Sequence, residues 1–442
     1  MRPRFPPILD LTITGRLDYK EAVRFNFIGA YDPAYPRSAV LCKGLVRIGV
    51  EVVECRAGAN FKFWARYPLL FLDAAKRGLL RTGADSRSGC FFVPEFCAKD
   101  VPLAKLLSVL TARPLIFDPL AARYETKIVD WGWRRGDTPA AWWNFRIDAA
   151  AFRLADLILA DTAAHKAYYC ATYGLDPAKV EVLPLGYDDK YFRPNVPNAR
   201  PNESDPPESF PGETPDVFAS SFPQRHQSDS SPWNSTDVRP REESKIPARG
   251  ASAGFQVLFF GSFLPLHGTE VVVEAARLVA ASDPSIRFRF IGEGRTFPQV
   301  RAAAAYLANV EFSGRLPLRE LPRAVAAADL CLGIFGRTEK ARRVVPHKIY
   351  QAMGMGRAVV TARTPAVEEF FVHGENIILC DEPYAESLAR AVLDLARGAA
   401  LRDRIARSGL DLVRREFTPE AVARRLAKIV ADRFGIAMPP RI

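Results

Sequence analysis

With 442 residues the chain is too long for one ordinary domain and predicts two, and its hydrophobic content of 48% is typical of a globular protein. The 61 Lys and Arg residues outnumber the 50 Asp and Glu residues, so the net charge of +11 indicates anionic partners, such as nucleic acid, acidic lipid or phosphorylated small molecules. No apolar run reaches the roughly 18 residues of a membrane span, and the first residues lack the pattern of a signal peptide, which excludes an integral membrane class and predicts a cytoplasmic protein.

Short apolar runs alternate with helical runs in the first half of the chain. The predicted strands are residues 24–31, 50–57, 90–97, 113–120, 155–162 and 179–186. The clearest helix between them covers residues 140–155. This alternation is typical of βαβ units and of a parallel sheet covered on both faces. Residues 1–194 are therefore predicted to form a Rossmann-like, doubly wound α/β domain.

One segment of this half, residues 60–81, mixes aromatic and apolar side chains with five Lys and Arg residues. Such a segment suits peripheral attachment to an anionic membrane, at the inner face of the cytoplasmic membrane for a cytoplasmic protein. The alternative is an amphipathic helix of the core, with the stems of its Lys and Arg side chains lying along the domain. The sequence alone leaves both interpretations open.

The composition changes abruptly between the two halves. Residues 195–254 are rich in Pro, Ser, Asn, Asp and Glu and show neither a helical nor a strand period. Such a segment cannot bury enough apolar surface to offset the entropy of ordering it. It is predicted to be a disordered Pro/Ser-rich linker.

The second half repeats the alternation more regularly. Its predicted strands are residues 256–262, 287–294, 310–314, 330–336, 357–362 and 376–380. Helical runs follow several of them, such as residues 269–281, and a long Arg-rich helical region ends the chain. Residues 255–415 are therefore predicted to form a second Rossmann-like domain, and residues 416–442 a C-terminal helix.

The run VVPHKIYQAMGMGRAVV, residues 344–360, predicts an anion site in this second domain. It reads as a loop that opens a short helix, whose unpaired N–H groups and partial positive charge attract phosphate. Five cationic or potentially cationic residues crowd the same loop and helix start: Lys340, Arg342, Arg343, His347 and Lys348. Without the neighbouring motifs, the charges of Lys340, Arg342 and Arg343 would be more typical of a solvated surface.

The order of motifs resembles family 4 retaining glycosyltransferases, which have the GT-B fold of two Rossmann-like domains facing each other across a cleft. The motifs that carry the resemblance are VLFFGSFLPLHGTEVVVEAARLV, FRFIGEG, VEFSGRLPLRELP, ADLCLGIFG and VPHKIYQAMGMGRAVVTARTPAVEEFFVHGEN. In the first half, IGAYDPAYPRSAVLCKGLVRIGVEVVEC and VEVLPLGYDDKYFRP are similar to the first strand and loop and to the domain exit of these enzymes.

The resemblance implies an enzyme that transfers a sugar from a nucleotide diphosphate sugar, bound mainly by the second domain, to a glycan or lipid-linked acceptor held by the first. The nucleotide sugar is a substrate, and no cofactor is implied. Because the chain has no Asp-x-Asp metal clamp, no metal site is predicted, and fixed cations must stabilise the leaving diphosphate. The C-terminal helix is expected to cross back to the first domain.

The resemblance also assigns roles to individual positions. The residues expected to act on the diphosphate are Lys340, Lys348 and His267. The residues expected to bind the rest of the donor are Gly261, Ser262, Gly268, Glu293, Gly294, Leu316, Gln351 and Glu369. The first domain is expected to supply an acceptor or closure loop from Gly29, Asp32, Arg37 and Asp118, with Arg37 contacting phosphate.

Two positions depart from the family pattern. His267 stands where a Lys is usual, and an imidazole carries a full charge only when it is protonated. Gln351 stands for the second Glu of an E-x7-E pair, and the first position falls on Arg343, so no paired-carboxylate mechanism is predicted.

These departures keep an alternative open, a catalytically silent nucleotide-sugar-binding protein. A nucleic-acid-binding protein would account for the net charge, but no basic and aromatic platform or known binding module is evident, so no nucleic-acid partner is predicted.

Overall fold

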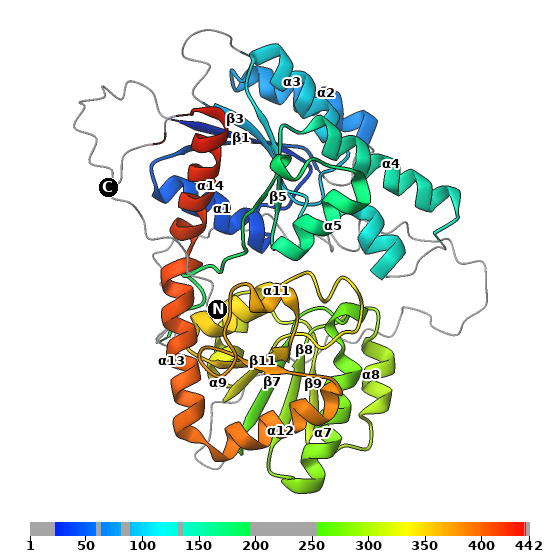
Figure 1. The fold of residues 1–442 in the computed structure, drawn as a ribbon, viewed down its shortest axis with the longest axis vertical. Coiled ribbons are helices and arrows are strands. Elements are labelled where there is room, and N and C mark those ends of the chain that lie inside the picture. The colour runs from blue at the N-terminus through cyan, green and yellow to red at the C-terminus, as the bar shows by residue number, and fades with distance from the viewer. Residues whose placement is uncertain are drawn as a thin grey trace.

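The computed structural model describes residues 23–58, 63–80, 89–130, 136–194, 254–436 and 438. These residues form two α/β domains, one above the other in Figure 1, each built on a six-stranded parallel sheet. The segment predicted as a linker, residues 195–254, lies outside the described residues except for Gly254.

The N-terminal sheet has the strand order β2-β1-β3-β4-β5-β6. Its strands are β1 (Arg24–Gly29), β2 (Glu51–Arg56), β3 (Gly89–Val93), β4 (Leu115–Phe117), β5 (Leu157–Ala160) and β6 (Val180–Val182). The helices of this domain are α1 (Pro36–Arg47), α2 (Phe63–Lys76), α3 (Val101–Thr111), α4 (Pro139–Leu154) and α5 (Ala163–Tyr173). A π-helix, Glu125–Asp130, follows β4, and a 3-10 turn, Pro177–Lys179, precedes β6.

The C-terminal sheet has the order β12-β11-β10-β7-β8-β9. Its strands are β7 (Gln256–Phe260), β8 (Arg287–Ile291), β9 (Val310–Ser313), β10 (Leu330–Leu332), β11 (Ala358–Ala362) and β12 (Ile378–Cys380). Its helices are α7 (Thr269–Ser282), α8 (Phe297–Ala303), α9 (Leu321–Ala327), α10 (His347–Gly354), α11 (Pro365–Glu368) and α12 (Tyr384–Arg397). A 3-10 turn, Pro265–His267, joins β7 to α7.

Local sequence explains where many of these elements begin. The strands β3, β5 and β11 are buried along their whole length, as expected for parallel strands with helices on both faces. Three helices, α4, α5 and α14 (Pro419–Phe434), begin after a threonine whose side chain accepts a hydrogen bond from the third amide beyond it. This capping satisfies an amide that has no partner within the helix.

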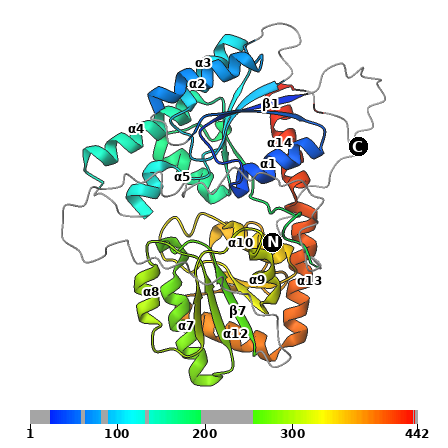
Figure 2. The same ribbon diagram turned by 180° about the vertical axis from the view of Figure 1, so that it is seen from behind.

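Two helices at the end of the chain run along one side of both domains (Figures 1 and 2). Helix α13 (Ala399–Glu416) packs on α10 and β11, and α14 packs on α1 of the N-terminal domain. Gly44 of α1 permits this contact, because a Cβ there would lie 2.0 Å from the carbonyl oxygen of Pro419. Val422, Leu426 and Val430 are buried in the core of the N-terminal domain.

Candidate functional site

The strand order of the C-terminal sheet reverses between β7 and β10, and ligands of such sheets bind where the carboxyl ends of the two strands diverge. Gly261 and Ser262 follow β7 at this point. The first turn of α10 lies opposite them, because a Cβ placed on Gly261 would be 3.1 Å from Lys348 Nζ. The end of the strand and the start of the helix therefore face each other.

Lys348, in the first turn of α10, is only 6% exposed. Its Nζ lies 3.8 Å from the centroid of the Phe259 ring and has no hydrogen-bond partner among the described residues. Burial lowers the pKa of this amine well below its usual value. A buried amine without an acceptor is costly for the fold, and an anion bound there would restore its charge.

His267 lies in the same place and is also buried. Its Nδ1 is hydrogen-bonded to the carbonyl oxygen of Ser262, so Nδ1 carries the proton and donates it. Burial, and next the charge of Lys348, lower the pKa of His267 well below its usual value. In this state the imidazole is neutral and fixes the loop after β7, whereas the sequence predicted a group acting directly on the diphosphate.

Lys340 approaches the same imidazole from the loop between β10 and α10 and is 7% exposed. Its Nζ donates a 2.8 Å hydrogen bond to Oγ1 of Thr126, in the π-helix of the N-terminal domain. The structure thus brings Lys340, Lys348 and His267 together, with Lys340 reaching across to the other domain.

The remaining donor positions lie on α10 and on the loops that follow β7, β8 and β9. Gly268 has φ +59°, and a Cβ there would lie 2.3 Å from the backbone of Phe335, so glycine lets the two loops meet. Gln351 lies one turn beyond Lys348 and is buried. Glu293 and Gly294 are exposed beyond the end of β8, and Leu316 lies beyond the end of β9.

Glu369 has a role that the sequence did not indicate. Its Oε2 accepts a 2.7 Å hydrogen bond from the backbone N–H of Ala163, the first residue of α5. The carboxylate therefore lies at the positive end of a helix of the N-terminal domain. This contact joins the two domains beside the candidate site.

The expected phosphate contact of Arg37 does not agree with the structure. Arg37 Nε lies 2.7 Å from an Asp118 carboxylate oxygen, and both side chains are almost fully buried. The remaining guanidinium hydrogen bonds go to the carbonyl oxygens of Leu183 and Pro184. With its donors used in this way, Arg37 ties α1 to β4 and to the segment after β6, and Asp118 is its partner.

The other two positions of the predicted closure loop shape the backbone after β1. Gly29 has φ +148°, and a Cβ there would lie 3.0 Å from Cys97 Sγ. Asp32 accepts a 2.9 Å hydrogen bond from the N–H of Ala34, which fixes a turn.

A buried ionic network between the domains escaped the sequence interpretation. Oε1 of Glu125 lies 2.9 Å from Arg343 Nη2, and its Oε2 lies 3.1 Å from His165 Nε2. The Nδ1 of the same imidazole lies 2.6 Å from Asp161 Oδ1. The spacing Asp161-x3-His165, at the end of a strand and the first turn of a helix, was the available signal. The sequence contains no comparable signal for Glu125, because its partners His165 and Arg343 lie 40 and 218 residues away along the chain.

The His165 and Glu125 side chains of this network are ionised although they are buried. Burial opposes protonation of His165, but Glu125 and Asp161 together outweigh it and raise the pKa of His165 to about 9. Burial likewise opposes ionisation of Glu125, but the charge of His165 and the neighbouring cations lower its pKa to about 2. An imidazolium between two carboxylates, with Arg343 beyond, therefore links β5 and the π-helix to the loop that carries Lys340.

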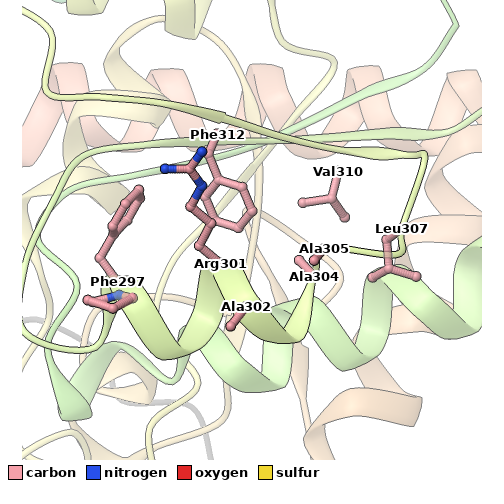
Figure 3. Close-up of a pocket in the computed structure, with 9 residues that line it drawn as sticks. Phe297, Arg301, Ala302, Ala304, Ala305, Leu307, Val310 and Phe312 are labelled. Carbon is pink, nitrogen blue, oxygen red and sulfur yellow. The ribbon is translucent and has the colours of Figure 1, made fainter.

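A separate apolar pocket lies on the flank of the C-terminal domain (Figure 3). It is formed by α8, the turn after it and the edge strand β9, with Phe297, Leu307, Val310 and Phe312 among its lining residues. None of the residues predicted for the site lines it.

Comparison with known proteins agrees with this geometry. Residues 254–397 match the family described as Glycosyl transferases group 1. The probable glycosyltransferase WbjE of Pseudomonas aeruginosa is 31% identical over 139 residues, which are 29% of this chain and 32% of that protein. The amylovoran biosynthesis glycosyltransferase AmsK of Erwinia amylovora is 26% identical over 167 residues, 37% of this chain and 41% of that protein. The matched regions span less than half of both relatives.

Solved structures are similar over nearly the whole chain. Anabaena Alr3699/HepE, in complex with UDP and glucose, aligns with a TM-score of 0.60 and 15% identity, covering 93% of this chain and 100% of that one. Sucrose-phosphate synthase from Thermosynechococcus elongatus aligns with a TM-score of 0.61 and 13% identity, covering 94% of this chain and 100% of that one. The chain therefore has the GT-B fold of glycosyltransferases, which confirms the predicted fold class.

Proposed function

We propose that this protein is a glycosyltransferase that moves a sugar, with retention of its anomeric configuration, from a nucleotide diphosphate sugar to a glycan or lipid-linked acceptor. The observation that carries the proposal is Lys348: a buried amine at the start of α10 and opposite Gly261, with no hydrogen-bond partner in the part of the chain that the structure describes. A diphosphate is the ligand that would match it, because a phosphate oxygen can accept from Nζ and from the first amides of the helix together.

In the proposed reaction, the bond between the sugar C1 and the phosphate oxygen breaks, and a bond from C1 to the acceptor oxygen forms on the same face. The proton of the acceptor hydroxyl passes to the departing phosphate oxygen. Lys348 and Lys340 stabilise the negative charge that develops on the leaving diphosphate. His267 holds the loop after β7 in position, and because these cations are part of the chain, the proposed reaction needs no metal ion.

Relatives help to choose the first donors to test. HepE has been crystallised with UDP and glucose and with UDP-glucose, and AmsK is named for the biosynthesis of amylovoran. UDP-sugars therefore come first, followed by GDP- and ADP-sugars.

Thermal-shift screening of the full chain against these donors tests the proposal, together with measurement of nucleoside diphosphate release in EDTA. We expect one class of donor to raise the melting temperature by mass action and to release its diphosphate in the presence of an acceptor. A failure of every nucleotide to raise the melting temperature would contradict the proposal. Binding without release from any donor would instead favour the silent nucleotide-sugar-binding protein.

We also propose that the N-terminal domain works at an anionic membrane surface. Among the described residues, no helix is both long and apolar enough to span a bilayer. Large apolar side chains are nevertheless exposed on three helices of this domain: Leu69, Leu72, Leu106, Val109, Leu110, Trp142 and Trp143. Figures 1 and 2 place α2 and α3 on the side of this domain away from the C-terminal domain. Leu70 and Ala74 pack α2 on the core, so this helix shows features of both interpretations of residues 60–81.

Sedimentation with phosphatidylglycerol and phosphatidylcholine vesicles tests this second proposal. We expect salt-sensitive binding to the anionic vesicles only, weakened in a Leu69→Ser/Leu72→Ser variant. The matched control is Tyr306→Ser, since Tyr306 is 70% exposed on the other domain. If the wild type and the double variant sediment equally with anionic vesicles, α2 does not contribute to membrane binding.

A further inference from the structure

The π-helix of the N-terminal domain carries a second side chain toward the loop between β10 and α10. Asp130, the last residue of this helix, is only 7% exposed. Four residues earlier, Thr126 Oγ1 accepts the 2.8 Å hydrogen bond from Lys340 Nζ. One turn of a π-helix takes between about four and five residues, because its hydrogen bonds join residue i to residue i+5, so both side chains lie on the same side. Asp130 therefore lies beside the loop that carries Lys340.

The carboxylate of Asp130 lacks the hydrogen bonds that a buried acid normally makes. Neither of its oxygens has a hydrogen-bond partner among the described residues. Burial raises the pKa of Asp130, whereas the charge of Lys340, and next the nearby Thr338 hydroxyl, lower it. A buried carboxylate without donors costs free energy, and such a group at the junction of two domains indicates a ligand that donates hydrogen bonds.

A donor without an acceptor lies at the same junction. Arg343 Nη2 lies 2.9 Å from Glu125 Oε1, which places the guanidinium group against the start of the π-helix. Its Nε is buried, and no residue that the structure describes accepts a hydrogen bond from it. A hydroxyl group suits both Arg343 and Asp130, since it donates one hydrogen bond and accepts others, whereas a carboxylate ligand only accepts.

The charges at this junction disfavour a ligand group that carries a further negative charge. Glu125 is already paired with Arg343 and His165. In the described part of the chain, Asp130 takes part in no ion pair within 4.0 Å. Once a diphosphate occupies Lys340, Asp130 is left facing the group attached to that diphosphate. A carboxylate on this group would be repelled, whereas hydroxyl groups would be accepted.

We propose that Asp130 accepts hydrogen bonds from hydroxyl groups of the donor sugar, with Arg343 Nε donating to one of them, and that this pair selects neutral sugars against uronic acids. The inference rests on the proposed function, since it names the class of sugar that the donor carries. The sugar is bonded directly to the phosphate that Lys340 would hold, so its hydroxyl groups come within reach of the π-helix. The N-terminal domain thus contributes to the choice of donor.

Calorimetric titration of the full chain with UDP, UDP-glucose and UDP-glucuronic acid tests the inference. We expect wild type to bind UDP-glucuronic acid about 10-fold or more weakly than UDP-glucose. Asp130→Asn should weaken UDP-glucose binding about 10-fold, as for a hydrogen bond to a charged group, and bring the two affinities close together. UDP, which lacks the sugar, should bind wild type and variant alike, which also shows that the variant is folded.

Glu339→Gln is the matched control. It removes one negative charge from the loop that carries Lys340, at a side chain that is 74% exposed. All three affinities should stay at their wild-type values in this variant. If Glu339→Gln narrows the preference for UDP-glucose as much as Asp130→Asn does, the preference comes from the general charge of the loop, and the assignment to Asp130 is wrong.

The outcomes separate this inference from the proposed function. If the thermal-shift screen selects GDP, the same series uses GDP, GDP-mannose and GDP-mannuronic acid. If the nucleoside diphosphate binds but wild type shows no preference for the neutral sugar, or Asp130→Asn keeps that preference, the inference is wrong and the donor site stands. If no nucleoside diphosphate binds, the proposed function fails and the inference fails with it. Binding of the nucleotide alone therefore distinguishes the two failures.

Discussion

Lys348 combines a binding role with a cost to the unliganded fold. Its amine is buried against the Phe259 ring, next to neutral His267 and without an acceptor among the described residues. Removal of a buried, unpaired ionisable group commonly stabilises a protein, whereas removal of a phosphate contact weakens ligand binding. Substitutions at this position should therefore affect stability and affinity in opposite ways.

Lys348→Met should raise the melting temperature of the unliganded protein and weaken nucleotide diphosphate binding by about 10- to 100-fold, the loss of one charged hydrogen bond. Differential scanning calorimetry and UDP titration measure the two effects. The exposed Lys428 on α14 supplies the control variant, Lys428→Met, which should change neither. A lower melting temperature together with unchanged affinity would show that Lys348 is only a packing residue.

His165 gives a prediction about pH. The folded state raises its pKa to about 9 from the usual 6.5, so the protonated network stabilises the fold fully below pH 6.5 and loses this contribution as the pH rises towards 9. The difference in unfolding free energy between wild type and His165→Gln should shrink by on the order of 3 kcal/mol between pH 6 and pH 9.5. Urea denaturation of both proteins at pH 6 and at pH 9.5 measures this change. A difference in unfolding free energy that stays constant with pH would mean that His165 is neutral in the folded protein.

At the scale of elements, the pattern of apolar runs predicted the strands. Contacts between residues that are far apart in the sequence were not predicted. All twelve predicted strand runs contain strands of the structure, because short continuous apolar runs between turn residues suit a buried parallel sheet. The run of residues 344–360 also predicted a short helix after a loop, and α10 begins there at His347. Arg37 was assigned to phosphate because nothing in the sequence indicates that Asp118, 81 residues away, neutralises it. The π-helix Glu125–Asp130 has no apolar period and was not predicted.

The packing of α14 on α1 gives a prediction at this scale. Gly44→Ala should lower stability by about 1–3 kcal/mol or more, because the added methyl group would overlap the Pro419 carbonyl. Gly136→Ala is the control, since the nearest atom to a Cβ there is the Tyr124 hydroxyl at 3.6 Å. Thermal unfolding of the two variants provides the comparison, and equal melting temperatures would show that α14 shifts without cost.

Several contacts between the two domains lie at the loop between β10 and α10, which carries Lys340, or near the start of α5. Thr126 accepts from Lys340, Glu125 pairs with Arg343, and Glu369 caps α5 from the other domain. The loop that carries Lys340 is thus held by the N-terminal domain even without substrate. A donor that binds Lys340 would compete with these contacts, which couples its binding to the relative position of the domains.

A double-mutant cycle of Glu125→Gln and Arg343→Met measures this link. Glu125 is fully buried and the Arg343 side chain is only 14% exposed, so we expect a coupling energy on the order of 1–3 kcal/mol in chemical denaturation. The exposed pair Glu274 and Arg277 on α7 should give less than about 0.5 kcal/mol in the same experiment. Similar values for the two pairs would show that the ionic contact does not hold the domains together.

The position of α14 also has a consequence for how this protein is made. Domains generally fold as units during synthesis, with the N-terminal one first. Here Val422, Leu426 and Val430 fill the apolar surface beside α1, although the ribosome adds them more than 200 residues after the last strand of that domain. The nascent N-terminal domain must keep this surface uncovered until α14 has been synthesised, which makes it a natural place for a chaperone to bind.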